Sequence, residues 1–585
     1  MRAAFFLILC CAAALSARAQ DTVPIDSIPP PATQAPQTLD HTPATLHGLV
    51  RNAATGEGIP RALVRIEGDD DTGALTDGDG RFEITGIFVG PQSVDVLKPG
   101  FFNTAFAGNA EAPPGVSGPP HNVLVAADMP DVVFTLAPTC TIRGRVDLST
   151  GEPAEGIEVG LVRRIVTDGR AAWQPSGFTK TRSDGTYRFG GLADGQYRLY
   201  TRPTLDSGPF AALAAPGKAA AARRWGYASI YYSDARDPSG SSAIQLSNGS
   251  EVQANFTLTR EPFQSVTLTV LPPQSLTLAH DGGNYSAELT DGAGYQLSYP
   301  TQYDTNAHTI QAALPDGTYS IVVTSTPGLE SLQRSRGPVV PANTGGGTLM
   351  GEADFSVSGH ALANLRVPLT PITSAPVQVS VIHGGTETEP SGTEQVAVML
   401  SPVQAMGGAL MGQYATGTTD SPLASSYMSP GQYWAHTFIS GHGLCESAFT
   451  AGGASLGREP LTIGLGGATA PLQLTLRDDC ARLTLSLPEN LLAIGAGEEK
   501  FYTVFAVPDF DFTWDVSPIV LRPSSGGSFT LDNLTPGSYD VYTFEGEAIL
   551  EYHNRDALRA LSNPGQAVTL SPGTTAHLVL EAPNP

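Results

Sequence analysis

The sequence predicts an all-β protein built as a tandem array of about five antiparallel β-sandwich domains. The first observation is composition, because only 15% of the chain is charged whereas Gly and Pro number 64 and 47. Few charges and many turn formers suit short strands joined by tight loops. The other two observations are repeats that recur at intervals of roughly 100–120 residues, which is the usual size of one domain.

The first repeat is a turn, an aromatic strand, a Gly/Pro turn and a second strand. Its clearest copies occupy residues 79–91 and 184–197, and looser copies occupy residues 308–319, 426–433 and 528–539. We interpret the Asp-Gly pair before the aromatic residue as a tight hairpin, because Gly tolerates a positive φ angle. The aromatic side chain is then expected to pack inward.

The second repeat marks the domain junctions. A strand with alternating apolar residues closes one unit and a similar strand opens the next, at 133–136 and 141–146, 255–258 and 265–270, 365–369 and 377–381, and 472–476 and 483–487. Alternation at period two indicates one buried face and one solvated face. The junctions divide the chain into sandwich units at residues 45–138, 139–260, 261–370, 371–478 and 479–585. Short linkers lead us to expect a semi-rigid rod.

The first 19 residues have the pattern of a signal peptide. Arg2 is followed by an apolar run and then by the small residues around Ala17 and Ala19. The run is shorter than the ~20 residues of a spanning helix. Residues 20–44 are rich in Pro and are expected to form a disordered leader. These features predict export to the periplasm, the cell surface or the medium, with no membrane span in the mature chain.

The number of cysteines and the net charge limit which disulfides and which classes of partner the chain can have. Cys445 and Cys480 lie near the same predicted junction, so we predict a disulfide between them and leave Cys140 as a free thiol. The formal net charge is −24. An acidic chain of this kind speaks against nucleic acid as a partner, because binding to phosphate backbones requires basic patches.

Two segments carry motifs of a known family. Residues 47–104 contain Gly48-Leu49-Val50-Arg51, then Thr76 through Ile84, then Lys98-Pro99-Gly100-Phe101; residues 142–202 repeat the pattern with Gly144-Arg145-Val146 and Arg182-Ser183-Asp184-Gly185-Thr186-Tyr187. Both resemble the carboxypeptidase regulatory-like domain, a transthyretin-like sandwich with a carbohydrate-binding-like fold. The last three units keep fewer of these features and are looser relatives or generic immunoglobulin-like sandwiches. The resemblance implies a module for folding, adhesion or carbohydrate binding, without catalytic machinery.

No catalytic constellation stands out in the sequence. The histidines are scattered singly, and the spacing of a zinc peptidase is missing. Ser455 lies in a Gly-x-Ser-x-Gly pattern, but that nucleophile elbow requires an α/β body rather than a β-sandwich. We therefore expect no enzymatic activity.

One candidate metal site is a group of carboxylates in a loop. Asp69, Asp70, Asp71, Asp77 and Asp79 offer the hard oxygen ligands that Ca²⁺ prefers. The alternative is that Asp77 and Asp79 simply form a turn, because the twelve-residue calcium loop with its terminal Glu is missing. Calcium is the one cofactor considered, and no other is predicted.

One candidate carbohydrate site is an aromatic cluster. Arg224, Trp225, Tyr227 and Tyr231 combine flat rings for stacking on sugars with a guanidinium that donates hydrogen bonds. The alternative is an ordinary strand whose rings lie in the core.

These observations favour an exported, non-enzymatic scaffold or adhesion protein of the cell envelope or the extracellular space. A carbohydrate-binding protein is the first alternative, and an accessory subunit of an exported enzyme is the second. The expected partners are polysaccharide or envelope proteins.

Overall fold

The structure of the chain is a computed structural model. It describes residues 42–69, 71–103, 121–206, 224–271, 284–291, 296–297, 299–304, 307–326, 349–371, 376–384, 386–388, 395–403, 413–418, 423–424, 431–440, 443–464, 469–493, 497–498, 500–562 and 564–581. The predicted signal peptide, residues 1–19, and almost all of the predicted leader lie outside these residues. No helix among the described residues is long and apolar enough to span a membrane.

The all-β prediction is confirmed. The described residues form two-sheet sandwiches around five main hydrophobic cores, which we call domains 1 to 5: residues 43–138, 140–258, 260–371, 376–477 and 481–580. Helix in this part of the chain is confined to α2 (Arg555–Arg559) and single 3₁₀ turns at Pro238–Gly240, Glu489–Leu491 and Pro523–Ser525.

Domains 1 and 2 each pair two four-strand layers. In domain 1 the first sheet has the strand order β4 (Arg81–Phe88), β1 (Pro43–Asn52), β8 (Val132–Pro138) and β6 (Phe101–Asn103). The second sheet has the order β3 (Gly73–Leu75), β2 (Leu63–Ile66), β5 (Gly90–Leu97) and β7 (His121–Val125). In domain 2 the first sheet has the order β12 (Thr186–Leu192), β9 (Cys140–Leu148) and β17 (Glu251–Gln253), and β18 (Phe256–Leu258) also pairs with β9. The second sheet has the order β11 (Arg170–Lys180), β10 (Glu158–Thr167), β13 (Gly195–Thr201) and β16 (Ile244–Leu246). Since β1 begins at Pro43, the predicted leader is two residues too long.

Domain 3 shares a sheet with the end of domain 2. Its first sheet has the order β22 (Thr301–Asp304), β23 (Thr309–Leu314), β19 (Arg260–Leu271) and β26 (Leu362–Pro368). Its second sheet has the order β21 (Gln296–Leu297), β20 (Asn284–Asp291), β24 (Gly317–Thr326), β25 (Leu349–Val357) and β27 (Thr370–Pro371). The first residues of β19 pair with β15 (Arg224–Tyr227), which pairs with β14 (Thr204–Leu205). One strand therefore crosses the junction, which restricts bending there.

Domains 4 and 5 complete the array. The first sheet of domain 4 has the order β29 (Thr386–Thr388), β28 (Pro376–His383), β37 (Leu472–Arg477), β34 (Cys445–Ala451) and β35 (Ala454–Ser455), and β32 (Leu423–Ala424) also pairs with β28. The second sheet has the order β31 (Gln413–Thr418), β30 (Gln395–Pro402), β33 (Gly431–Ser440) and β36 (Leu461–Ile463). Domain 5 contains β42 (Ser528–Leu534), β38 (Ala481–Ser486), β45 (Thr575–Val579), and β41 (Ile519–Leu521), β40 (Tyr502–Pro508), β43 (Gly537–Glu545), β44 (Gln566–Leu570).

The opening and closing strands of every domain pair in parallel. This holds for β1 with β8, β9 with β17 and β18, β19 with β26, β28 with β37, and β38 with β45. Parallel neighbours run in the same direction. The chain therefore enters each sandwich at one end and leaves it at the other, which places the next domain end to end with the last.

The interpretation of the first repeat as a tight hairpin is wrong. In domain 1, β4 pairs with β1 whereas β3 and β5 pair with β2, so both turns around β4 pass the chain between the two sheets. The physical reason is burial from both sides: Phe82 of β4 and Val94 of β5 enter the same core from opposite layers. The repeated segment is a corner, and β12–β13, β23–β24 and β42–β43 follow the same path.

A buried tyrosine fixes this corner in three domains. The hydroxyls of Tyr197, Tyr319 and Tyr539 donate to the carbonyl oxygens four residues earlier, at O–O distances of 2.8, 2.9 and 2.7 Å. Burial raises the pKa of each phenol. The Gly-x-Tyr pattern is thus explained by packing, because a buried phenol needs a hydrogen-bond partner.

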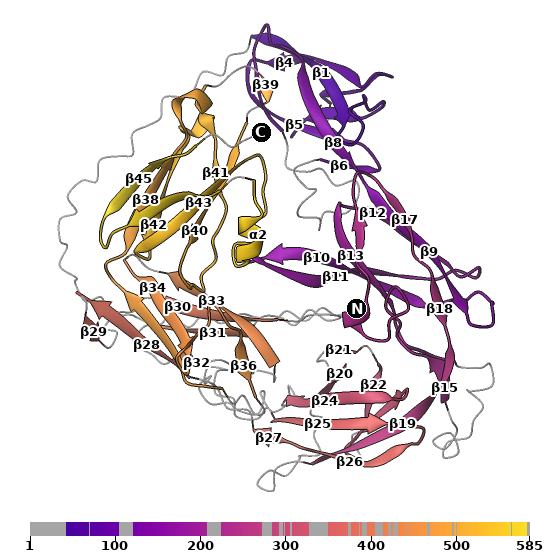
Figure 1. Cartoon of the computed structure of the whole chain (residues 1–585). Coiled ribbons are helices and arrows are strands. Elements are labelled where there is room, and N and C mark those ends of the chain that lie inside the picture. Colours follow the sequence, from indigo (N-terminus) through magenta and orange to yellow (C-terminus); the bar gives the residue numbers. More distant parts are fainter. Residues whose placement is uncertain are drawn as a thin grey trace, which may run out of the picture.

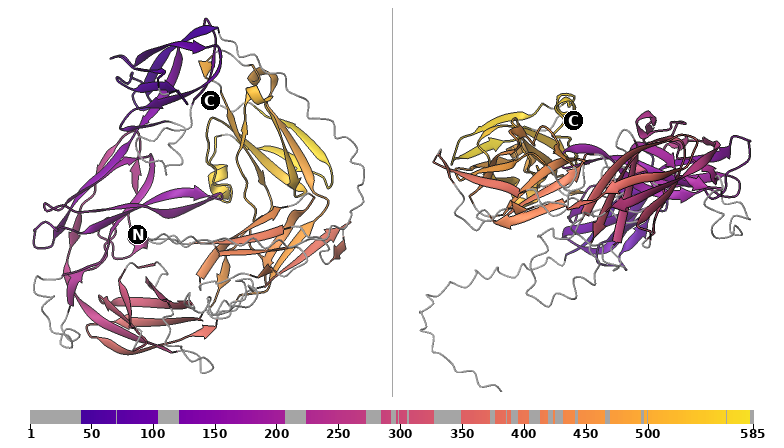
Figure 2. Two further views of the ribbon diagram at one scale, coloured as in Figure 1. Left: turned by 180° about the vertical axis from the view of Figure 1, so that it is seen from behind. Right: turned by 90° about the horizontal axis from the view of Figure 1, so that it is seen from below.

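The five domains form a closed ring rather than the expected rod (Figure 1). Two contacts between distant parts of the chain close it. The short strand β39 (Gly497–Glu498) of domain 5 pairs with β7 of domain 1. The β10–β11 hairpin extends from domain 2 to domains 4 and 5, as the view from behind in Figure 2 also shows. The linkers are short as expected, but nothing in their sequence revealed that the array curves back on itself.

Candidate functional site

The predicted calcium ligands cap turns in domain 1. The Asp69 carboxylate accepts from the Asp71 amide (3.1 Å) and the Thr72 hydroxyl (2.7 Å), which holds the pKa of Asp69 below its ordinary value. The Asp77 carboxylate accepts from the amides of Asp79 (2.9 Å) and Arg81 (2.8 Å). Asp70 lies outside the described residues. Within them, no group of three or more acidic, His or Cys side chains has the arrangement of a metal site.

The predicted carbohydrate residues do not form one surface. Arg224, Trp225 and Tyr227 lie on β15, and the Arg260 guanidinium covers the Trp225 ring at 5.0 Å from its centroid. Tyr231 is only 5% exposed and stacks on Tyr200 in a separate buried cluster. For Tyr231 the ordinary alternative, a ring in the core, describes its position.

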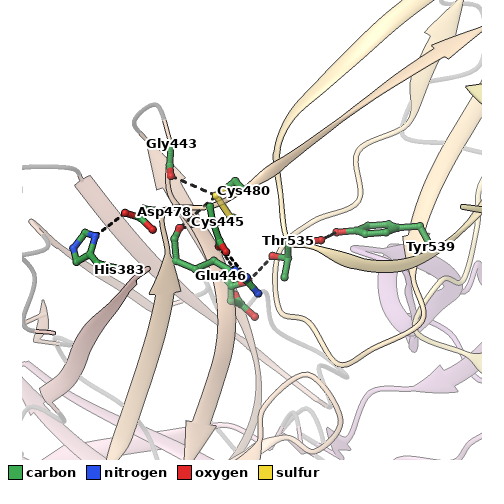
Figure 3. A network of polar contacts seen from close by, with 10 residues as sticks. His383, Gly443, Cys445, Glu446, Asp478, Cys480, Thr535 and Tyr539 are labelled. Atoms are coloured by element: carbon green, nitrogen blue, oxygen red, sulfur yellow. Dashed lines mark hydrogen bonds and ion pairs between the residues drawn. A yellow bond between two sulfur atoms is a disulfide. The ribbon is translucent and has the colours of Figure 1, made fainter. Parts of the chain in front are cut away.

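The cysteines in the described part of the chain form one disulfide and one buried free thiol. Cys445 and Cys480 are bonded to each other, at the junction between domains 4 and 5 (Figure 3). Cys140 is buried beside Asp194, with 3.3 Å between its sulfur and a carboxylate oxygen. Burial raises the pKa of the Cys140 thiol, which disfavours the reactive thiolate.

The structure brings polar groups together at a place that the sequence analysis missed, the tip of the β10–β11 hairpin. Its two-residue turn is Asp168-Gly169, with φ angles of 49° and 67°. Positive φ at both residues is the type I′ turn that Asp-Gly favours between paired strands. Asp-Gly between two strands was therefore the sequence signal that could have revealed this hairpin.

The hairpin tip lies between domains 4 and 5. We call this contact the three-domain joint; it comprises Arg164, Asp168, Gly169 and Arg170 of domain 2, Trp434, His436 and Gly457 of domain 4, and Asp515, Glu551, Tyr552 and His553 of domain 5. In Figure 1 the hairpin points at the segment around α2.

Gly169 packs directly against Tyr552. A Cβ atom on Gly169 would lie 2.3 Å from Cε2 of that ring, so only glycine fits. The ring is held in place, because its hydroxyl donates to Asp515 (2.6 Å) and accepts from the Val516 amide (3.2 Å). The His553 amide in turn donates to the Gly169 carbonyl at 3.1 Å. The fit is thus fixed from both sides.

Two arginines of the hairpin hold it at the joint. Arg164 forms a bidentate ion pair with Glu551, with N–O distances of 2.8 and 3.0 Å, and this pair lowers the pKa of Glu551. Arg170 lies over the ring of Trp434, 3.6 Å from its centroid, and donates to the Gly457 carbonyl at 3.1 Å. Burial lowers the pKa of Arg170 to about 10, so it stays charged at neutral pH.

One buried and one partly buried histidine lie at the joint. His436 is 3% exposed, and its Nε2 lies 3.7 Å from an Asp168 oxygen. Burial lowers the pKa of His436, an effect that Asp168 and Asp515 oppose and Arg170 reinforces. Burial, together with Arg170 and His436, lowers the pKa of His553 to about 3. Burial raises the pKa of Asp168, opposed by His436. The closed joint therefore favours neutral imidazoles.

Domains 4 and 5 are also joined by a buried carboxylate beside the disulfide (Figure 3). The Glu446 side chain accepts from the Thr513 amide (3.0 Å) and the Thr513 hydroxyl (2.6 Å) of domain 5, and from the hydroxyl of Thr437 in its own domain. The Glu446 carbonyl accepts from the hydroxyl of Thr535. Burial raises the pKa of Glu446. These bonds satisfy a group whose burial would otherwise be costly.

A cavity of about 880 Å³ opens beside the three-domain joint. Domain 5 supplies most of its wall: Val507 to Phe512, Asp540, Tyr542, Tyr552, His553, Arg555, Leu558, Arg559, Leu561, Pro564 and Gly565. Arg170 comes from domain 2 and Arg458 from domain 4.

Comparison with known proteins assigns the first domain. Residues 45–117 match the model of the carboxypeptidase regulatory-like domain, which confirms the resemblance found for residues 47–104. The corresponding prediction for residues 142–202 remains a prediction. No curated protein matches the chain.

Solved structures with local similarity include two pilins and the TIE protein of Bacillus anthracis. The Bacillus anthracis TIE protein is 11% identical over 70% of this chain and 71% of its own, with a TM-score of 0.17. A streptococcal ancillary pilin is 11% identical over 56% and 100%, with a TM-score of 0.18. The major pilin subunit of Bacillus cereus is 9% identical over 76% and 99%, with a TM-score of 0.13. Similarity at this level transfers no function to this chain.

Proposed function

We propose that the chain is an exported, non-enzymatic scaffold of the cell envelope or the extracellular space, which works as a closed frame of β-sandwich domains. The observation that supports this proposal best is the three-domain joint. Its partly buried polar groups bind other domains: Arg164 binds Glu551, and Arg170 packs on Trp434. Such groups fix the frame, and the outer faces of the domains are left for partners. Those partners are envelope proteins or polysaccharide.

Two further features support a structural role. The parallel opening and closing strands place domains end to end, and the shared strand β19 stiffens one junction. The Cys445–Cys480 disulfide and the buried Glu446 hold another. An exported protein benefits from disulfides, which persist in oxidising compartments.

Fractionation of the native cells tests export. The protein should occur in the envelope or in the medium, with a mass that corresponds to removal of residues 1–19. Recovery of the full-length precursor in the cytoplasm would refute the proposal.

Cross-linking in intact cells with a membrane-impermeant reagent tests the scaffold role. We expect reproducible adducts with envelope components for the wild-type chain. Arg164→Glu should open the frame and change those adducts, and the charge-swapped Arg164→Glu/Glu551→Arg chain should restore them. Identical adducts in the open and closed frames would show that closure has no part in partner binding.

A further inference from the structure

The cavity beside the three-domain joint has the size of a small-ligand site. Its volume of about 880 Å³ lies within the usual range for such sites, which are common at domain interfaces. None of the predicted calcium or carbohydrate residues lines it, and its wall comes from domains 2, 4 and 5. Two charged side chains in this wall lack partners of opposite charge.

Arg170 is the first of these side chains. Among the described residues its guanidinium makes one hydrogen bond, to the Gly457 carbonyl, and no carboxylate forms an ion pair with it. Its Nε atom is buried and has no acceptor. A buried donor or cation without a partner costs free energy. An anionic group in the cavity would supply the counter-charge that the guanidinium lacks.

Asp540 on β43 is the second. Its carboxylate has no hydrogen bond or ion pair within the described part of the chain. Burial, and after it the nearby Asp509 carboxylate, raise the pKa of Asp540. Within the described residues Asp509 forms an ion pair only with the exposed Arg555 of the same wall, at an N–O distance of 4.0 Å. Two such carboxylates in one wall favour a cationic group between them.

The other charges of the wall are already paired. Arg458 forms an ion pair with Asp511 at 3.2 Å, and Arg559 pairs with Asp556 at 2.9 Å. A polyanion would leave the Asp540 carboxylate without a counter-charge, and a neutral ligand would leave both Arg170 and Asp540 without one. A ligand that complements both side chains carries one negative and one positive group.

We propose that this cavity binds a short zwitterionic peptide, with its terminal carboxylate at Arg170 and its terminal ammonium at Asp540 and Asp509. Charge-assisted hydrogen bonds at both ends give such a ligand its affinity. The aromatic rings of Tyr542 and Phe510 in the same wall provide apolar contact for the residues between. This binding activity goes beyond the scaffold role and does not depend on it.

Calorimetric titration of the mature chain tests the proposal. The probes are tri-, tetra- and penta-alanine, each with free ends, with an acetylated amino end, with an amidated carboxyl end, and with both ends blocked. We expect binding of at least one free-ended length. Each block should weaken binding about tenfold or more, because each removes one charge-assisted contact.

Two variants connect each end of the peptide with its residue. Arg170→Gln should abolish the effect of amidation and keep the effect of acetylation, and Asp540→Asn should do the reverse. The retained effect in each variant shows that the cavity is intact. Arg482→Gln serves as the matched control, since it removes a charge from an exposed ion pair of domain 5 that does not line the cavity, and it should keep both effects.

Several results would overturn the proposal. These are failure of all free-ended peptides to bind at millimolar concentration, equal binding of free and fully blocked peptides, and a loss of both blocking effects in either variant. Binding of an acidic oligosaccharide in place of the peptides would assign the cavity to a different class of ligand.

Discussion

Gly169→Ala should open the ring at the hairpin tip. The new methyl group would lie 2.3 Å from a Tyr552 carbon, well inside the ~3.5–4.0 Å of favourable carbon contacts. Either the ring moves and loses its bonds to Asp515 and Val516, or the tip withdraws. Withdrawal loses the His553 amide bond, the Arg164 ion pair and the Trp434 contact.

Both routes have a similar cost. Each lost interaction contributes on the order of 1 kcal/mol, so movement of the ring costs about 2 kcal/mol and withdrawal of the tip about 3 kcal/mol. A free-energy change of this size corresponds to about a 30- to 100-fold rise in the open population. Alanine also meets a backbone penalty of about 1 kcal/mol, because the φ angle of Gly169 is positive.

Gly156→Ala is the matched control. Gly156 lies in the same domain with a φ angle of 75°, close to the 67° of Gly169, and a Cβ there would meet no atom within 4 Å. It therefore carries the backbone penalty without the clash.

The assay is hydrogen exchange of the His553 amide, with small-angle scattering as a measure of overall size. Gly169→Ala should speed this exchange about 30- to 100-fold and enlarge the particle, whereas Gly156→Ala should do neither. Equal behaviour of the two variants would refute the reasoning, because it would mean that the hairpin tip does not close the ring.

Three further predictions concern the joints. Arg164→Glu should lower the free energy of ring closure by about 1–3 kcal/mol and Glu551→Arg in the same chain should recover most of it, measured as the coupling energy of a double-mutant cycle; independent effects of the two changes would argue against a direct pair. The closed joint holds His553 neutral and lowers its pKa to about 3, so closure of the ring should weaken as the pH falls from about 6.5 toward 3. The particle size of the His553→Gln chain, measured by small-angle scattering, should depend less on pH than that of the wild type. The same pH dependence in both chains would contradict this assignment. Loss of the disulfide in Cys445→Ser/Cys480→Ser should cost about 3–4 kcal/mol, judged from the 35-residue separation, with a lower unfolding temperature that reducing agent no longer affects; a chain as stable as the wild type would contradict it.

Sequence reasoning succeeded where the evidence was local. Alternating strands such as Val133 to Leu136, and the Gly-x-Tyr pattern before Tyr197 and Tyr539, report burial through their own period and chemistry. They therefore predict sandwich domains of the right number and kind.

The corner and the ring could not be predicted in this way. A turn at Gly90 has the same sequence signal whether it joins neighbours in one sheet or strands in two sheets, and only the pairing of β4 and β5 decides. The contact between Arg164 and Glu551 joins residues 387 positions apart. The sequence does not indicate that these two residues form an ion pair, since charged side chains are common on any protein surface.

Functional side chains were missed for a related reason. The sites predicted from the sequence were clusters of residues that are neighbours along the chain, such as the aspartates near Asp69 and the aromatic residues near Trp225. The cavity instead collects Arg170, Arg458 and Asp540 from three domains. Their proximity exists only in the folded ring.

The parallel pairing of opening and closing strands has a mechanical consequence. When the two ends of a domain are pulled apart, strands such as β38 and β45 slide along each other in opposite directions. Tension then loads all the hydrogen bonds of the ladder at once, so they must break together and cannot be unzipped one after another. Each domain is thus built to resist stretching along the direction in which its neighbours would transmit a load.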